Sequence, residues 1–278
     1  MLKKKLDRNL RFSENEVYYN GAPPNICPHF YKPPGVPEDL LTLDKQTIKK
    51  MDVLKFDKKK VQYVYNPVDY AYAGYSRYVR KYLKSSKKIL FVGLNPGPYG
   101  MCQTGIPFGD VSTVKEWMEL EMDISKPLDE CPKKPVDGLK CTTIEQSGKR
   151  FWGFFKKKCG AADNFFRNAF VINYCPIAFF DRSGKNVTPN ELEVSSREEL
   201  EKICDEYLEK VVEMVKCEII ICVGRYAEHK VKSIFIDNSE INILYMKHPS
   251  PQVGSEDNWL ADAHEFLIDN HLSQYFSE

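Results

Sequence analysis

Two proline-stiffened loops each present one polar side chain that could do chemistry. The apolar run 89–92 is typical of a strand buried on both faces, and it gives way to Asn95-Pro96-Gly97-Pro98. The apolar run 241–246 ends in the same manner, in His248-Pro249-Ser250-Pro251. Prolines and glycines this dense stop a strand in a rigid turn. Open α/β sheets place their ligand sites at such strand ends, so we expect Asn95 and His248 to share one site.

Two further loops carry candidate site residues. The apolar run 170–174 delivers Asn173 just before Cys175-Pro176. The glycine-rich segment 100–109 predicts a loop with one helical turn, and Phe108 is held there between Pro107 and Gly109. Taken singly, these residues have ordinary structural interpretations. Asn95 could belong to a simple β-turn, His248 could bond a backbone carbonyl, and Asn173 could cap a turn.

The motifs together resemble a known family, the single-strand-selective monofunctional uracil-DNA glycosylases of the uracil-DNA glycosylase superfamily. The resemblance covers residues 61–267, in order, and rests on the run Gly93 to Gly109, Tyr65-Asn66-Pro67 with Tyr70-Ala71, Phe151-Trp152-Gly153-Phe154-Phe155, Asn173-Tyr174-Cys175-Pro176, Val223-Gly224-Arg225 and His248-Pro249-Ser250-Pro251. One such motif would be weak evidence, whereas several in one order are strong.

The resemblance implies a role for each candidate residue. His248 would donate a hydrogen bond to the charge that develops on uracil O2. Asn95 would hold the attacking water, and since an amide is no base it could only orient that water. Asn173 would read the base by donating to O4 and accepting from N3–H, and Phe108 would stack on the flipped base.

The resemblance also predicts a pocket wall and a DNA wedge. Gly97 would leave room beside C5 of the pyrimidine, so that 5-substituted uracils such as 5-hydroxymethyluracil are accepted, and Met101 would line the pocket. The loop Pro249, Ser250, Pro251 and Gln252 would push into the duplex. Related proteins have an arginine where this chain has Gln252, which predicts weaker activity on double-stranded DNA.

Charge and cysteine content narrow the possible functions. The net charge is only +1, but basic residues gather in two stretches, 77–88 and 149–158, which predict either a phosphate-binding face or an ordinary solvated helix face. The nine cysteines form no Cys-x-x-Cys pair, so we expect reduced thiols, no metal site and no cofactor. Neither a signal peptide nor a membrane span is expected. The expected partner is single- and double-stranded DNA containing uracil, and the protein is expected to be a monomer located in the nucleus.

Alternating strand and helix patterns predict the fold class. We expect a three-layer αβα domain with a central, mostly parallel sheet over residues 38–278, preceded by an extended or partly ordered arm over residues 1–37. Helices are expected at 38–54, 69–83, 111–120, 147–159, 195–215, 225–234 and 257–271, and further strands at 61–65 and 218–223. Segment 125–141 is expected to be an irregular connection.

Three functions compete. The favoured one is a monofunctional DNA glycosylase that excises uracil and 5-substituted uracils by hydrolysing the N-glycosidic bond of a flipped-out nucleotide in base excision repair. Lys247, beside His248, leaves a lyase step open. The alternative is a catalytically weak uracil- or damage-binding protein. An unrelated nucleotide-binding α/β protein is disfavoured, because neither a Gly-x-Gly-x-x-Gly turn nor a phosphate-loop lysine follows any strand.

Overall fold

The computed structural model describes residues 35–277. The first 34 residues of the arm expected over 1–37 lie outside this range, and its last residues already belong to the first helix. The helices are α1 (Val36–Met51), α2 (Pro67–Tyr70), α3 (Tyr72–Tyr82), α4 (Met101–Thr104), α5 (Gln146–Cys159), α6 (Ala162–Asn168), α7 (Val194–Val215), α8 (Arg225–Ile234) and α9 (Glu256–Asp269). The strands are β1 (Tyr63–Tyr65), β2 (Ile89–Gly93), β3 (Ala169–Asn173), β4 (Ala178–Phe180), β5 (Asn186–Val187), β6 (Ile219–Val223) and β7 (Asn242–Met246).

A four-stranded parallel sheet forms the centre of the domain. Its strands run in the order β3-β2-β6-β7, and every neighbouring pair is parallel. Strands β2 and β3 are buried along their whole length, as their unbroken apolar sequences predict. The order places the two site strands, β2 and β7, on either side of β6.

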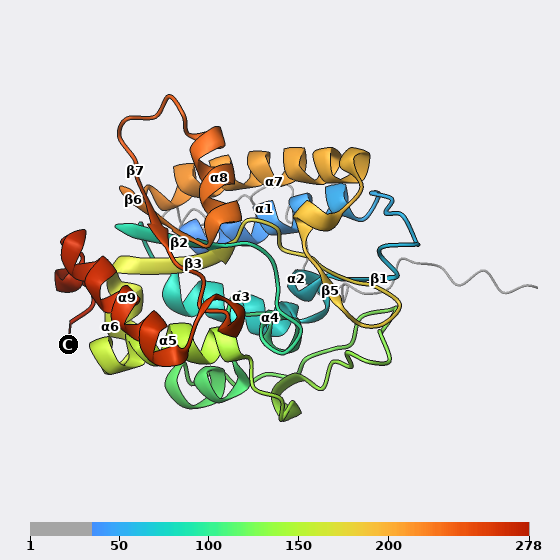
Figure 1. The fold of residues 1–278 in the computed structure, drawn as a ribbon, viewed down its shortest axis with the longest axis horizontal. Helices are drawn as coiled ribbons and strands as arrows, with labels where there is room; N and C mark the ends of the chain where they lie inside the picture. Colours follow the sequence, from blue (N-terminus) through green and yellow to red (C-terminus); the bar gives the residue numbers. More distant parts are fainter. Residues whose placement is uncertain (1–34, 278) are drawn as a thin grey trace, which may run out of the picture. The chain divides into compact units, whose positions relative to one another are not determined.

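Helices cover both faces of this sheet, which confirms the expected three-layer αβα class (Figure 1). One layer contains α7 and α8, with α1 packed along α7, and the other contains α5, α6 and α9. The second layer has an aromatic core, in which Phe91 of β2 meets Phe151 and Phe155 of α5 at ring-centroid distances of 5.5 and 5.3 Å. Helix α3 contacts the edge strand β3, where the Tyr78 hydroxyl donates to the carbonyl of Val171 at 2.9 Å.

The sequence patterns did not predict three features of the fold. Strands β1, β4 and β5 form a separate antiparallel sheet, so the strand expected at 61–65 stands outside the central sheet. The helix expected at 69–83 is broken at Ala71 into α2 and α3. The helix expected at 111–120 contains a π-helical turn, Thr113–Trp117, a form that sequence patterns do not indicate. The Trp117 indole at its end donates to the carbonyl of Gly160 at 2.7 Å.

The irregular connection expected at 125–141 is present, with a single 3₁₀ turn at Gly138–Lys140. It packs beside the loop that carries Asn95. The Gln103 side-chain nitrogen donates to the carbonyls of Pro98 and Pro135, at 3.0 and 2.9 Å. Its side-chain oxygen accepts from the backbone N–H groups of Asp137 and Gly138. This buried amide therefore uses both ends to tie the connection to the loop.

Candidate active site

The register of the central sheet brings the candidate residues to one edge. Gly93, at the end of β2, lies opposite Asn173, at the end of β3. On the other side, Val92 lies opposite Cys222, and Val223 lies opposite Met246. Asn95 follows Gly93 by two residues, and His248 follows Met246 by two. Parallel strands end together, so the loops bearing Asn95, Asn173 and His248 leave the sheet at the same edge.

Phe108 and Asn173 converge over Gly93. A Cβ atom added to Gly93 would lie 2.5 Å from Asn173 Oδ1 and 3.0 Å from the ring of Phe108, so only glycine fits there. Asn173 Nδ2 donates to the thioether sulfur of Met101 at 3.1 Å. Because sulfur is a weak acceptor, a base carbonyl could replace it at little cost. The side-chain donor of Asn173 is thus only lightly engaged in this structure.

The ring of Phe108 is fixed by the aromatic layer beneath it. It stacks on Phe151 with centroids 4.9 Å apart and planes 21° apart, and its centroid lies 6.1 Å from that of His248. The backbone of Phe108 has φ of 54°, a strained value for a bulky residue. The close approach of the Phe108 carbonyl to α5 depends on Gly148, where an added Cβ would lie 2.1 Å from that oxygen. Such local strain is typical of functional sites.

His248 is held as a neutral donor. The backbone N–H of Ser250 donates to His248 Nδ1 at 3.1 Å, so the proton of the neutral ring resides on Nε2. Burial lowers the pKa of His248 to about 4. Gly224, at the end of β6, has φ of +101° and lies against the ring. The Gly224 position in the Val223-Gly224-Arg225 motif therefore supports the histidine.

Asn95 has a buried donor with no partner among the described residues. Its Nδ2 atom is inaccessible to solvent and makes no hydrogen bond in the part of the chain that the structure describes. Leaving a buried amide donor unpaired costs about 1–3 kcal/mol. A cost of this size at the end of a central strand marks a side chain placed for something other than stability.

Gly97 packs against the side chain of Glu145. An added Cβ would lie 2.8 Å from Glu145 Oε2, so the direction of the missing side chain is filled by a carboxylate. The expected role of Gly97 toward the base stays a prediction. Sequence reasoning did not single out Glu145, because it lies 48 residues further along the chain.

The expected wedge loop projects from the site edge. Pro249 is buried, whereas the 3₁₀ turn Pro251–Val253 is exposed, with Gln252 at its centre. Arg150 of α5 fastens both ends of this loop. It is only 8% exposed, and its Nη1 donates to the carbonyl of Gly254 at 2.9 Å and to that of Pro249 at 3.5 Å. Sequence analysis had counted Arg150 among the surface charges.

The basic stretch 77–88 does not line the site. Its first part bonds to neighbouring segments, with Arg80 bound to Glu38 at 2.8 Å and Arg77 donating to the carbonyl of Glu121. Its second part lies at the amino end of β2, where Lys88 pairs with Glu218 and Lys87 is 6% exposed. The site lies at the other end of the same strand, about 16 Å away at 3.3 Å per residue. The α5 group is closer, since its exposed Lys149 adjoins Arg150.

The side chain of Lys247, the residue next to His248, is bonded to α9. Lys247 Nζ pairs with Asp262 of α9 at 2.8 Å, and the carbonyl of Lys247 accepts from the indole of Trp259 at 2.8 Å. An amine held as a charged ion pair is a poor nucleophile. The geometry therefore favours a structural role for Lys247, which is to hold α9, rather than a role in a Schiff-base step.

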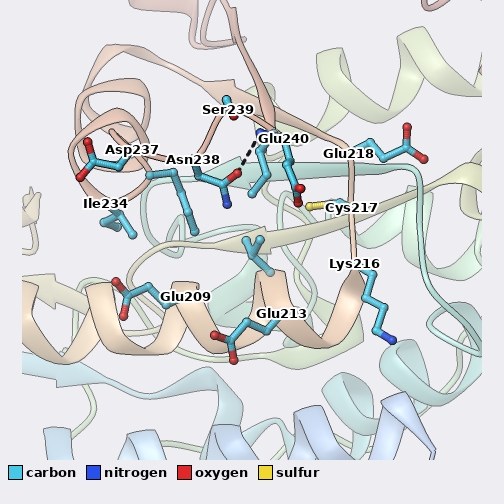
Figure 2. A pocket seen from close by; sticks show the side chains of 13 residues that line it. Glu209, Glu213, Lys216, Cys217, Glu218, Ile234, Asp237, Asn238, Ser239 and Glu240 are labelled. Carbon is cyan, nitrogen blue, oxygen red and sulfur yellow. Dashed lines mark hydrogen bonds between the residues drawn. The ribbon is translucent and has the colours of Figure 1, made fainter.

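A large pocket lies away from this site (Figure 2). It opens between the ends of α7 and α8 and the amino ends of β6 and β7, at the opposite edge of the sheet. Its lining is rich in carboxylates, namely Glu209, Glu213, Glu218, Asp237 and Glu240. An acidic lining repels phosphate, so the pocket is unsuited to bind DNA.

The described part of the chain contains eight cysteines, all of them free thiols, and seven are buried. Between residues 35 and 277, no helix has both the length and the apolar content that crossing a bilayer requires.

The fold and these motifs match one superfamily. The model of the uracil DNA glycosylase superfamily matches residues 80–267. The solved structure of Pedobacter heparinus SMUG2 superposes with a TM-score of 0.53 and 17% sequence identity, covering 82% of this chain and 98% of that one. At this identity the structural likeness concerns the fold alone. The chain belongs to the uracil DNA glycosylase superfamily, whose enzymes hydrolyse N-glycosyl bonds.

Similarity to curated proteins narrows this assignment and confirms the resemblance drawn from the motifs. The single-strand selective monofunctional uracil DNA glycosylases of Mus musculus and Bos taurus are each 43% identical to this chain over 206 residues. The matches cover 73% of this chain and 74% and 76% of the two relatives.

Proposed function

We propose that this protein excises uracil and 5-substituted uracils from single- and double-stranded DNA as a monofunctional glycosylase in base excision repair. The observation that carries the proposal is the neutral, Nε2-protonated ring of His248 at the edge where Asn95, Phe108 and Asn173 meet. Relatives at 43% identity are single-strand selective monofunctional uracil DNA glycosylases, which supports the substrate class. A nuclear location remains part of the proposal.

The chemistry follows from the charge that bond cleavage creates. As the N-glycosidic bond breaks, negative charge grows on the uracil and positive charge on the sugar. His248 donates from Nε2 to uracil O2 and stabilises that anion without itself losing a proton. A preorganised donor of this kind is commonly worth about 3 kcal/mol. The ring stays neutral because its Nδ1 is occupied by the Ser250 N–H and burial opposes a charge.

The remaining residues select the base and orient the attacking water. The flipped base stacks on Phe108, and Asn173 bonds its O4 and N3–H, a pattern that cytosine reverses. Asn95 aims a water at the sugar carbon, so the reaction depends more on departure of the base than on activation of the water. Acceptance of 5-substituted uracils rests on the family resemblance, because Glu145 fills the space beside Gly97.

Single-turnover cleavage of a labelled oligonucleotide with one uracil, as single strand and as duplex, tests the proposal. We expect an abasic product from the wild type and a rate about 100- to 1000-fold lower for His248→Ala. The matched control is His264→Ala, which removes an exposed histidine of α9 that bonds Lys158. Tight binding without product from the wild type would instead favour the damage-binding alternative.

A further inference from the structure

Glu145 connects two loops of the candidate site. It lies directly before α5, and its backbone N–H donates to Asp110 Oδ1 at 3.2 Å, two residues after Phe108. Its carboxylate reaches the other loop, where Oε2 accepts the backbone N–H of Tyr99 at 3.3 Å. A single residue therefore contacts both the segment that presents Asn95 and the segment that presents Phe108.

The backbone of the Asn95 loop lies directly on the Glu145 side chain. An added Cβ at Gly97 would lie 2.8 Å from Oε2, and one at Gly100 would lie 2.9 Å from Cγ. A Cβ atom at either position would force the flexible Glu145 side chain to shift, and the hydrogen bond from the Tyr99 N–H to Oε2 opposes that shift. Gly100 has φ of −105° and ψ of −104°, which lies outside the regions that other residues populate, so its backbone favours glycine independently of Glu145. Gly97 has no positive φ, so its contact with Glu145 is the feature that bears on glycine at that position.

Enclosing this carboxylate is unfavourable in itself. Burial raises the pKa of Glu145, and the backbone N–H groups of Tyr99, Ser147 and Gly100 oppose that rise, while the neighbouring charge of Asp110 adds to it. Because the pKa remains raised, these hydrogen bonds do not fully offset the desolvation of the carboxylate. Its presence against the loop is therefore better explained by the geometry that it imposes.

We propose that Glu145 is a positioning residue. Its carboxylate holds residues 97–100 in place and thereby fixes the aim of Asn95, and its bulk, rather than the base, is the reason for glycine at 97. The inference rests on the proposed function, because it assumes that Asn95 orients the water.

The first test separates positioning from binding. Glu145→Ala is expected to lower the single-turnover rate roughly 10- to 100-fold, since small misplacements of reacting groups have effects of this size. DNA affinity should stay unchanged, because Glu145 is not assigned to a DNA contact. Glu145→Gln retains an acceptor and the volume, so it should restore most of the rate. Glu209→Ala, an exposed glutamate of α7, is the control.

The second test identifies what requires glycine at 97. Rates are compared on uracil and 5-hydroxymethyluracil for Gly97→Ala, Glu145→Ala and the double variant. If Glu145 imposes the glycine, Gly97→Ala slows both substrates alike and adds no further loss once Glu145 is gone. Thermal melting of each variant verifies folding.

The contrary outcomes are distinct. Multiplying losses in the double variant, or a Gly97→Ala defect confined to 5-hydroxymethyluracil, would overturn the inference and restore a role of Gly97 toward the base. An active wild type with equally active Glu145→Ala would also overturn it while leaving the proposed function standing. Only an inactive wild type would contradict both this inference and the proposed function.

Discussion

Two residues, His248 and Gln252, stand four positions apart and set different properties of the proposed enzyme. His248 is enclosed and bonded through Nδ1, so its electrostatics are decided by packing. Gln252 sits at the exposed centre of a 3₁₀ turn, so its effect depends on what it meets in the DNA. Each residue yields a prediction that a single substitution or titration can test.

The cleavage rate should not change across the pH range in which an ordinary histidine titrates. With a pKa of about 4, His248 is already neutral at pH 5, and it gains a proton only as the pH falls through 4. That proton would enter at Nδ1 and oppose the Ser250 N–H. We therefore expect the histidine-dependent rate to be level from pH 5 to pH 8 in single-turnover assays. A break near pH 6.5, the ordinary histidine value, would contradict this.

Gln252→Arg should shift the strand preference. A cation at the exposed tip gains phosphate attraction where glutamine has none, so cleavage of duplex substrate should rise relative to single-stranded substrate. The measurement is the ratio of the two single-turnover rates at fixed salt. Gln274→Arg, in the exposed C-terminal segment, controls for added charge alone. An unchanged ratio would show that the tip residue does not limit duplex entry.

At the scale of elements, α5 organises the site from below. In its first turns, Gly148 contacts the backbone of Phe108, and Phe151 stacks on the ring of Phe108. Arg150, between them, binds the wedge loop. Disturbing one such anchor should affect the loop it holds.

Arg150→Ala should release the wedge loop. The variant loses a charged hydrogen bond to the carbonyl of Gly254, a kind commonly worth about 1.5–3 kcal/mol, and a longer one to the carbonyl of Pro249, so both stability and cleavage should fall. Denaturant unfolding and single-turnover rates on duplex substrate measure the two effects. Lys156→Ala, an exposed position on the same helix, is the matched control. Equal activity of both variants would exclude the anchoring role.

At the scale of the whole molecule, α1 is joined to the domain through a buried carboxylate. Asp44 of α1 accepts the hydroxyl of Tyr207 of α7 at 2.9 Å. Burial raises the pKa of Asp44 to about 7, and hydrogen bonds from Tyr75 and Tyr207 oppose the rise. The folded protein therefore holds a proton here that the unfolded chain, with a pKa of 3.8, has released at neutral pH.

Stability should consequently fall with rising pH through this group. The contribution is fully present below pH 3.8 and is lost as the pH rises through about 7. Three pKa units correspond to about 4 kcal/mol, which is an upper bound. Compared with wild type, Asp44→Asn should gain free energy of unfolding between pH 5 and pH 8, measured by denaturant titration. Asp39→Asn, exposed on α1, should show no such gain.

The sequence by itself determined the strands of the central sheet, most of the helices and the family. Apolar runs of four to six residues bounded by proline and glycine are local signals, and they placed β2, β3, β6 and β7 to within one residue. Proline and glycine also indicated the loops after those strands, so Asn95, Asn173 and His248 could be named as candidate site residues before the fold was known.

Only the tertiary structure decided what surrounds those residues. The Nε2 proton of His248, the Glu145 carboxylate against Gly97, the Arg150 anchor and the pairing of Arg80 with Glu38 all depend on long-range packing. The antiparallel sheet of β1, β4 and β5 escaped prediction for the same reason, since its short strands acquire meaning only by pairing. Sequence pattern reports the preferences of a segment, whereas the partners of a side chain are set when distant segments pack.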